Sequence, residues 1–176
     1  MLAAASLRHV ARRSILMRMP RPRVYIDTSV IGGCEDPEFS AGSRAFFDQV
    51  RRGRYVAMVS EMTYFELQRA PAAVRAVLDA LPQDSVVEAP IDDEVEVLAQ
   101  AYIDAGALGA SRRADAIHIA AATVARADLV LSWNFQHIVN FNRIHKFKGV
   151  NMQQGYPAFE IYSPLELGHD DQDQDL

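Results

Sequence analysis

Short apolar runs alternate along the chain with longer segments in which apolar residues recur every three or four positions. The runs are rich in β-branched residues, as buried strands are, and they lie at 24–26, 55–59, 86–87, 129–131 and 159–161. The periodic segments predict helices at 41–52, 61–67, 71–81, 92–105, 112–125 and 140–154. Strands that alternate with helices in this way predict an α/β fold whose parallel sheet is covered on both faces.

Residues with special backbone or capping properties mark the element boundaries. Ser60 can cap the helix that follows the second strand, Pro71 can begin the next helix, and Gly106 can end the helix at 92–105. The run Ser163-Pro164-Leu165-Glu166 is a capping-box signal with proline at the first helical position. Gly32-Gly33 through Pro37 predicts a loop. No internal repeat or linker separates residues 23 and 167, which indicates one domain.

Bulk composition narrows the class of protein. The chain has 176 residues, of which 49% are hydrophobic and 23% charged, as in a soluble globular protein. The single cysteine, Cys34, excludes an internal disulfide and a multi-cysteine metal site, so we expect a reducing cytoplasm as the location. No apolar run approaches the roughly 18 residues needed to span a bilayer, so no membrane segment is predicted.

Charge is distributed unevenly along the chain. Six of the 18 Lys and Arg residues fall within 1–23, where there is no acid, so 12 remain against 23 Asp and Glu elsewhere. We expect 1–22 to be a basic flexible extension, or the product of a mis-assigned start when translation begins at Met17 or Met19, although an organelle transit peptide has a similar composition. Residues 168–176 are predicted to be an acidic disordered tail. The acidic body argues against wholesale binding of phosphate backbones, but a cation-binding cluster of acids remains compatible with a nuclease.

Four polar residues stand where strands end or the following helices begin. Asp27 follows the first strand, Glu66 lies on the helix after the second, Asp115 is near the start of the helix at 112–125, and Asn134 follows the fourth strand. In a parallel sheet these positions share one edge, so the four side chains are predicted to face a common cleft. Each residue alone also has an ordinary explanation, as a turn cap, a solvated helix acid or an acid in a first helical turn.

Asp115 is unusual because its helix is almost entirely apolar. Ala114, Ala116, Ile117 and Ile119, followed by alanines at 120–122, leave the helix almost no solvated face. A carboxylate in such a segment requires a cation or a hydrogen-bond donor as a partner.

These residues carry a resemblance to a known family. Val-Tyr-Ile-Asp27-Thr-Ser-Val, the Glu66 helix, Arg-Ala-Asp115-Ala-Ile-His-Ile-Ala and Leu-Ser132-Trp-Asn134-Phe resemble the successive motifs of PIN-domain ribonucleases, especially the VapC-type toxins of toxin-antitoxin pairs. The resemblance covers 23–167 and implies a three-layer α/β/α sandwich on a five-stranded parallel sheet. It also implies Mg²⁺ or Mn²⁺ as cofactor, RNA as substrate, a small antitoxin as partner, and assembly as a homodimer or larger complex with that antitoxin.

The resemblance also assigns roles to residues. Asp27, Glu66 and Asp115 match the three central acids and are the expected metal ligands, with Asp27 and Asp115 nearest the metal and Glu66 acting directly or through water. These three acids and Asn134 are the expected catalytic residues. Asn134 stands at a fourth position that is commonly Asp, which removes a negative charge and leaves open whether one metal binds or two. Five neighbouring residues are expected to contact the metal ligands or RNA: Thr28, Ser132, Arg112, Arg113 and His118. Of these, His118 is interpreted as a packing or hydrogen-bonding residue and not as a catalytic one.

Two further segments have alternative interpretations. Basic residues between His137 and Lys148 either meet RNA phosphates or form a solvated helix face. Trp133 and Phe135 either stack on bases or belong to the core, which is the commoner role of aromatic residues beside a strand.

Other functions remain open at this point. A non-catalytic PIN-like module that binds RNA or protein is compatible with Asn134. A phosphotransferase with an aspartyl-phosphate intermediate also uses an Asp at a strand end, but the haloacid-dehalogenase type requires a second Asp two residues later, where this chain has Ser29. Nucleotide binding by a glycine loop is disfavoured because Gly32-Gly33 lacks the following Lys-Ser/Thr pair.

Overall fold

The sheet has five parallel strands in the order β3-β2-β1-β4-β5, in a computed structural model that describes residues 21–167. Tyr25 of β1 lies opposite Met58 of β2 on one side and Val130 of β4 on the other. The strands are β1 (Arg23–Ile26), β2 (Val56–Ser60), β3 (Val86–Ala89), β4 (Leu129–Leu131) and β5 (Glu160–Tyr162). The α/β fold with a five-stranded parallel sheet is therefore confirmed.

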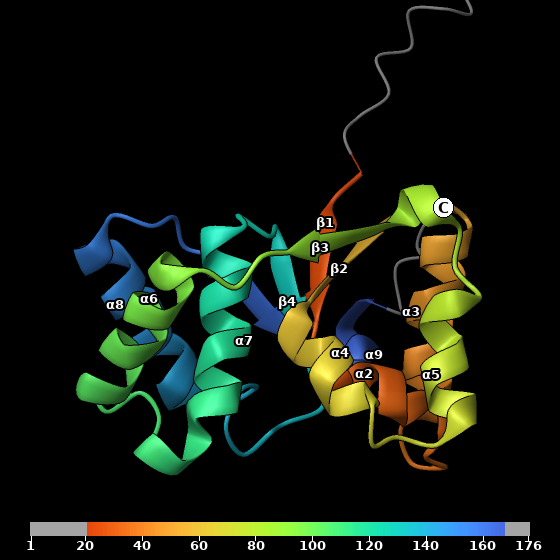
Figure 1. Cartoon of the computed structure of the whole chain (residues 1–176), viewed down its shortest axis with the longest axis horizontal. Helices are drawn as coiled ribbons and strands as arrows, with labels where there is room; N and C mark the ends of the chain where they lie inside the picture. Colours follow the sequence, from red (N-terminus) through yellow and green to blue (C-terminus); the bar gives the residue numbers. More distant parts are fainter. Residues whose placement is uncertain (1–20, 168–176) are drawn as a thin grey trace, which may run out of the picture.

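Helices connect the strands and lie on both sides of the sheet (Figure 1). They are α2 (Thr28–Gly32), α3 (Ser40–Arg51), α4 (Glu61–Leu67), α5 (Ala72–Asp79), α6 (Asp93–Asp104), α7 (Arg113–Val124), α8 (Phe141–Gln154) and α9 (Pro164–Leu167). Three short 3-10 turns complete the described chain: η2 (Gly33–Glu35), η3 (Gln83–Ser85) and η4 (Ala110–Arg112). The helices predicted from the periodic pattern are present, with ends that differ by one or two residues.

Two apolar cores lie against opposite faces of the sheet. Helices α6, α7 and α8 cover one face, while α2, α3, α5 and α9 lie on the other (Figure 1). Successive residues of β1 point to opposite faces, so Val24 and Ile26 pack in one core and Tyr25 in the other. Because both faces are covered, the strand is apolar at every one of these positions.

Helix α7 is the most deeply buried helix of the described chain. All eight residues from Ala116 to Thr123 are buried, as its apolar sequence predicts. A buried polar link joins α7 to its neighbours: the Tyr102 hydroxyl donates to Asn151 Oδ1 at 2.6 Å and lies 3.0 Å from Thr123 Oγ1. Helices α6, α7 and α8 are thereby held together by hydrogen bonds within an otherwise apolar layer.

The loop predicted for residues 32–37 is wrong for residues 32–35, which are helical. Helix α2 continues to Gly32 and the 3-10 turn η2 includes Gly33, whose φ of −58° is helical. A Cβ atom on Gly33 would stand 2.8 Å from Trp133 Nε1, and one on Gly42 would stand 2.9 Å from the same indole ring. These glycines therefore provide space for Trp133 and do not mark a change in chain direction.

The predictions for the two ends of the chain fall mostly outside the described residues. Residues 1–20 and 168–176 lie outside them, and so do the predictions of a basic extension and an acidic tail, apart from residues 21 and 22. Arg21 donates to the Asp84 carbonyl oxygen at 2.7 Å. Within 21–167, no helix combines the length and apolar character that crossing a membrane requires.

Candidate functional site

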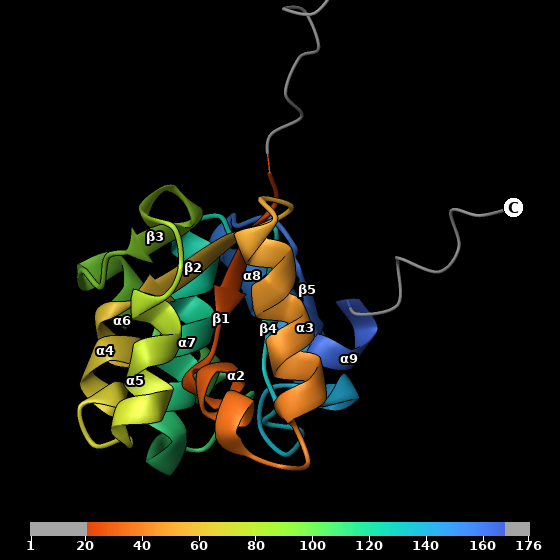
Figure 2. The ribbon, with the colours of Figure 1, turned by 90° about the vertical axis from the view of Figure 1, so that its right-hand side faces the viewer.

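The strand order creates a crevice at the carboxyl ends of β1 and β4. From β1 the chain proceeds to β2 and β3 on one side, and then returns to β4 on the other side of β1. The connections after β1 and β4 therefore diverge, which is where ligands bind in open α/β sheets. Helices α2, α4 and α7 gather at this end (Figure 2).

A pocket of about 600 Å³ occupies this crevice. It is lined by Asp27, Thr28, Ser29, Gly32, Gly33, Asp36, Phe39, Glu66, Asp115, Trp133 and Asn134. The four side chains that the sequence placed at one sheet edge therefore line one pocket. They come from the ends of β1 and β4 and from α4 and α7.

Asp27 has a buried carboxylate held by hydroxyl groups. The residue is only 7% exposed, and its Oδ2 accepts hydrogen bonds from Ser29 Oγ and Ser132 Oγ, each at 2.7 Å. Ser132 Oγ also accepts the backbone N–H of Asn134 at 2.9 Å. These bonds fix the carboxylate between β1 and β4, because hydrogen bonds to a charged acceptor are stronger than neutral ones.

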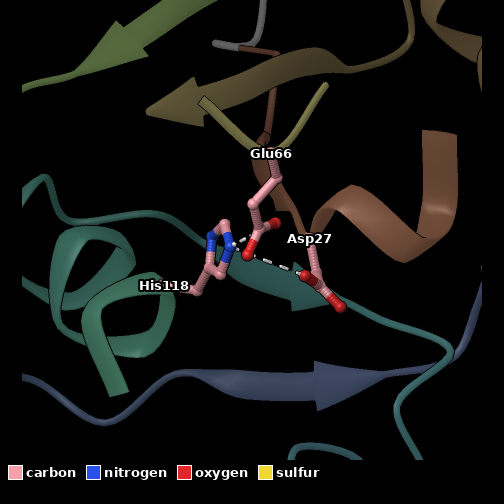
Figure 3. A group of neighbouring side chains, drawn as sticks. All are labelled: Asp27, Glu66 and His118. Atoms are coloured by element: carbon pink, nitrogen blue, oxygen red, sulfur yellow. Dashed lines mark hydrogen bonds and ion pairs between the residues drawn. The ribbon is translucent and has the colours of Figure 1, made fainter. Parts of the chain in front are cut away.

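Glu66 reaches the same place from α4. Its Oε2 accepts hydrogen bonds from Thr28 Oγ1 and from His118 Nε2, the latter at 3.2 Å (Figure 3). Partial burial by itself raises the pKa of Glu66, but the hydrogen bond and positive charge of His118, together with the Thr28 hydroxyl, lower the pKa below its ordinary value. Glu66 is therefore held in its ionised form.

His118 lies behind the carboxylates and is 1% exposed. Its Nδ1 is 2.8 Å from the Tyr25 hydroxyl, which is in turn 2.7 Å from Ser60 Oγ. Its Nε2 lies 3.8 Å from Asp27 Oδ1, besides its bond to Glu66. Burial alone lowers the pKa of His118, but Tyr25 and the two carboxylates outweigh it and raise the pKa.

Asp115 and Asn134 form the opposite part of the pocket wall. Asn134 Nδ2 donates to Asp115 Oδ1 at 3.2 Å, and Asn134 Oδ1 accepts the His137 N–H at 3.0 Å. Burial and then the charge of Asp27 raise the pKa of Asp115, against smaller opposing effects of His137, His118 and Arg112. The pocket therefore holds two carboxylates that repel each other, a condition that a cation relieves.

The two arginines at the start of α7 have different environments. Arg113 forms an ion pair with Glu96 and donates to Gln100 Oε1 at 3.0 Å, so its guanidinium is engaged by α6. Arg112 is exposed, and its charge lowers the pKa of Asp115, which places it within electrostatic reach of the pocket. The two adjacent arginines therefore differ in their relation to the pocket.

Basic side chains between His137 and Lys148 form hydrogen bonds and ion pairs within the protein. Arg143 donates to the Ala107 carbonyl oxygen and Lys146 donates to the Gly106 carbonyl oxygen, which joins α8 to the turn after α6. Lys148 pairs with Glu160 at 2.8 Å. His137 is buried, and within residues 21–167 neither of its ring nitrogens has a hydrogen-bond partner. The geometry favours the interpretation as a helix face over an RNA-binding patch.

Sequence reasoning missed the aromatic wall of the pocket. Phe39 stacks on Trp133 with ring centroids 4.7 Å apart, and Trp133 Nε1 donates to Ser43 Oγ at 2.9 Å. Trp133 is buried, as its interpretation as a core residue requires, whereas Phe135 is 48% exposed. Phe39 and Asp36 both precede α3 and line the pocket. No local pattern distinguishes Phe39, because its position depends on packing against Trp133, which is nearly a hundred positions away.

Comparisons with known proteins extend the fold assignment. No protein-family model and no curated protein sequence matches the chain. A chain in the crystal structure of VapBC2 from Rickettsia felis, bound to a DNA fragment from their promoter, is similar in fold with a TM-score of 0.52 and 11% sequence identity. The match covers 80% of this chain and 98% of that chain. At this identity the similarity concerns the fold, and it agrees with the PIN-like architecture that the motifs imply.

Proposed function

We propose that this protein is a metal-dependent endoribonuclease and the toxin of a toxin-antitoxin pair. The observation that carries the proposal is the convergence of Asp27, Glu66, Asp115 and Asn134 on one pocket at the carboxyl ends of β1 and β4. If these residues were only turn caps or solvated helix acids, their side chains would not be expected to line the same pocket. The fold similarity to a chain of the VapBC2 structure supports the same assignment.

The donor atoms in the pocket suit a hard divalent cation. Mg²⁺ and Mn²⁺ bind carboxylate oxygens, and Mg²⁺ typically takes one or two of them directly. Asp27 and Glu66 offer oxygens on one side, and Asp115 offers them on the other. Burial and the charge of Asp27 raise the pKa of Asp115, and a cation bound near these carboxylates would lower it. A bound cation would activate water and neutralise charge on a scissile phosphate.

The surrounding residues have definable tasks in such a site. Ser132 orients the Asp27 carboxylate, and Asn134 orients Asp115 while contributing no charge of its own. With one acid fewer, the pocket favours one cation over two. Arg112 is available for the phosphate of the substrate, and the half-buried Phe39 offers a ring face in the pocket on which a base can stack.

The test is RNA cleavage by the purified full-length protein with Mg²⁺ or Mn²⁺ and without any antitoxin. Asp27→Asn and Asp115→Asn should each abolish cleavage, while Asp104→Asn should retain it, because Asp104 is an exposed acid on α6 whose bond to Gln100 is remote from the pocket. Cleavage that persists in both pocket variants would contradict the proposal, as would the absence of any metal-dependent cleavage in the parent protein.

A non-catalytic PIN-like binding module is the competing function, and the observation that favours it is Asn134. Its amide already satisfies Asp115 with a hydrogen bond, so part of the pocket can be stable without a cation. Such a module would bind its RNA or protein partner equally well after Asp27→Asn and would show little specific metal binding. Calorimetric titration with Mn²⁺, followed by partner binding with the same variant, distinguishes the two functions.

A further inference from the structure

A buried nitrogen atom lies behind two of the carboxylates that line the pocket. His118 Nε2 lies 3.2 Å from Glu66 Oε2 and 3.8 Å from Asp27 Oδ1, and one ligand atom from each of the three residues lies within 4.8 Å of the others (Figure 3). A cation with ligands at about 2.1 Å places neighbouring ligand atoms about 3 Å apart and opposite ones about 4 Å apart. The three side chains therefore match the spacing of a coordination shell. Among the described residues 21–167, this is the group of His and acidic residues whose ligand atoms lie within that distance of one another.

The orientation of the imidazole is set by partners on its other side. Tyr25 O–H lies between His118 Nδ1, at 2.8 Å, and Ser60 Oγ, at 2.7 Å. When the Tyr25 hydroxyl donates to Ser60, it can accept a hydrogen from Nδ1–H, which leaves the lone pair of Nε2 directed at Glu66 and Asp27. A second hydrogen bond of this kind is the usual support of a metal-binding histidine. The edge-to-face packing of the Tyr25 and His118 rings, with centroids 5.9 Å apart, restricts rotation further.

We propose that His118 is a direct ligand, oriented by Tyr25, and that this nitrogen makes the site select Mn²⁺ over Mg²⁺. The inference rests on the proposed metal site and specifies its chemistry. Mg²⁺ prefers an all-oxygen shell, whereas transition metals accept imidazole and gain affinity from it. In the metal-free protein Nε2–H donates to Glu66, and a cation that binds here would displace this proton and take its place between the nitrogen and the carboxylate. Asp115 is outside the trio and acts from the other wall of the pocket.

The experiment compares metal affinity and coordination in full-length wild type, His118→Gln and Tyr25→Phe. Calorimetric titration of metal-free protein with MnCl₂ and with MgCl₂ should show tighter Mn²⁺ binding by the wild type. His118→Gln should weaken Mn²⁺ binding by about tenfold or more and Mg²⁺ binding much less, and Tyr25→Phe should change the preference in the same direction. His145→Gln is the matched control, because that histidine is exposed on α8 and bonds the Phe141 carbonyl oxygen.

A spectroscopic readout of the wild type makes the test independent of how the variants fold. Electron spin-echo modulation of the Mn²⁺-loaded protein should show coupling to a directly bound imidazole nitrogen, which His118→Gln should remove. Bound Mn²⁺ without that coupling, or equal losses of Mn²⁺ and Mg²⁺ affinity in His118→Gln, would overturn the assignment. RNA cleavage that depends on Asp27 would then still support the proposed function, whereas the absence of any metal binding would overturn both.

Discussion

Replacing Ser132 with Ala should destabilise the protein through the two backbone segments that this hydroxyl joins. Ser132 is completely buried, donates to Asp27 Oδ2 at 2.7 Å and accepts the Asn134 N–H at 2.9 Å. Alanine fits the same space but provides neither interaction. Asp27 then keeps one hydroxyl donor, Ser29, and the Asn134 N–H loses its acceptor.

The expected loss follows from the kind of bond removed. A hydrogen bond to a charged group contributes about 1.5–3 kcal/mol, and a partly buried N–H left without an acceptor costs about 1 kcal/mol more. Ser132→Ala should therefore lower the free energy of unfolding by about 2.5–4 kcal/mol, a large share of the 5–15 kcal/mol typical of a domain. Ser85→Ala is the matched control, since Ser85 is equally buried but bonds only the neutral Pro82 carbonyl oxygen, and it should lose about 1 kcal/mol.

Urea unfolding of the metal-free proteins, followed by far-ultraviolet circular dichroism, measures both losses. Ser132→Ala should also reduce Mn²⁺ affinity by about tenfold or more, because residues that orient a metal ligand commonly have effects of that size. If Ser132→Ala loses no more stability than Ser85→Ala and binds Mn²⁺ normally, then Ser132 does not hold the Asp27 carboxylate in place, and the reasoning is refuted.

Three other predictions concern titration, reactivity and RNA contact. Despite burial, His118 and Thr28 lower the pKa of Glu66 from 4.5, so ionised Glu66 stabilises the fold above pH 4.5 and this stabilisation is lost on acidification. Metal-free Glu66→Gln should therefore lose less stability than wild type as the pH falls below 4.5. Equal losses of stability in the two proteins over this pH range would contradict the prediction. Burial raises the pKa of Cys34 to about 11, so a thiol reagent at pH 8 should label the native protein far more slowly than the urea-unfolded chain, and equal rates would show that Cys34 is accessible. Arg112→Ala should weaken RNA binding and reduce its salt dependence by about one released ion, whereas Arg113→Ala should do neither. RNA titrations at several salt concentrations, in a catalytically inactive background, measure both effects. Equal effects of the two substitutions would show that both arginines contact RNA.

The local pattern of apolar residues was sufficient to place most helices and strands. Each element needs an apolar face to pack on an adjacent layer, and this requirement is the same whichever element forms that layer. The apolar run Leu129–Leu131 matches β4 residue for residue, and Gly106, expected to end a helix, has a φ of +67° directly after α6. Both features depend on side-chain size and backbone freedom within a few positions. The α/β class with a parallel sheet could therefore be predicted without knowledge of the tertiary contacts, whereas the PIN-like architecture was implied by the resemblance of the motifs.

Local pattern failed where a distant side chain decides the conformation. Gly33 and its neighbours carry the composition of a loop but are helical, and the glycine at 33 is required because Ser43 and Trp133 occupy the space that a side chain would need. Arg112 and Arg113 are adjacent and chemically identical, yet only Arg113 is engaged by Glu96. Arg112 ends the 3-10 turn η4 whereas Arg113 begins α7, which packs against α6, so the position of α6 separates their roles.

By itself, the sequence determined the class of fold and the four polar residues at one edge of the sheet, because both follow from the order of strands and helices. Only the tertiary structure decided that β4 lies beside β1, which opens the pocket there, and that His118 meets Glu66 and Asp27. His118 and Glu66 are 52 residues apart on different helices. Their contact depends on how α4 and α7 pack against each other, and no periodicity within either helix encodes that packing.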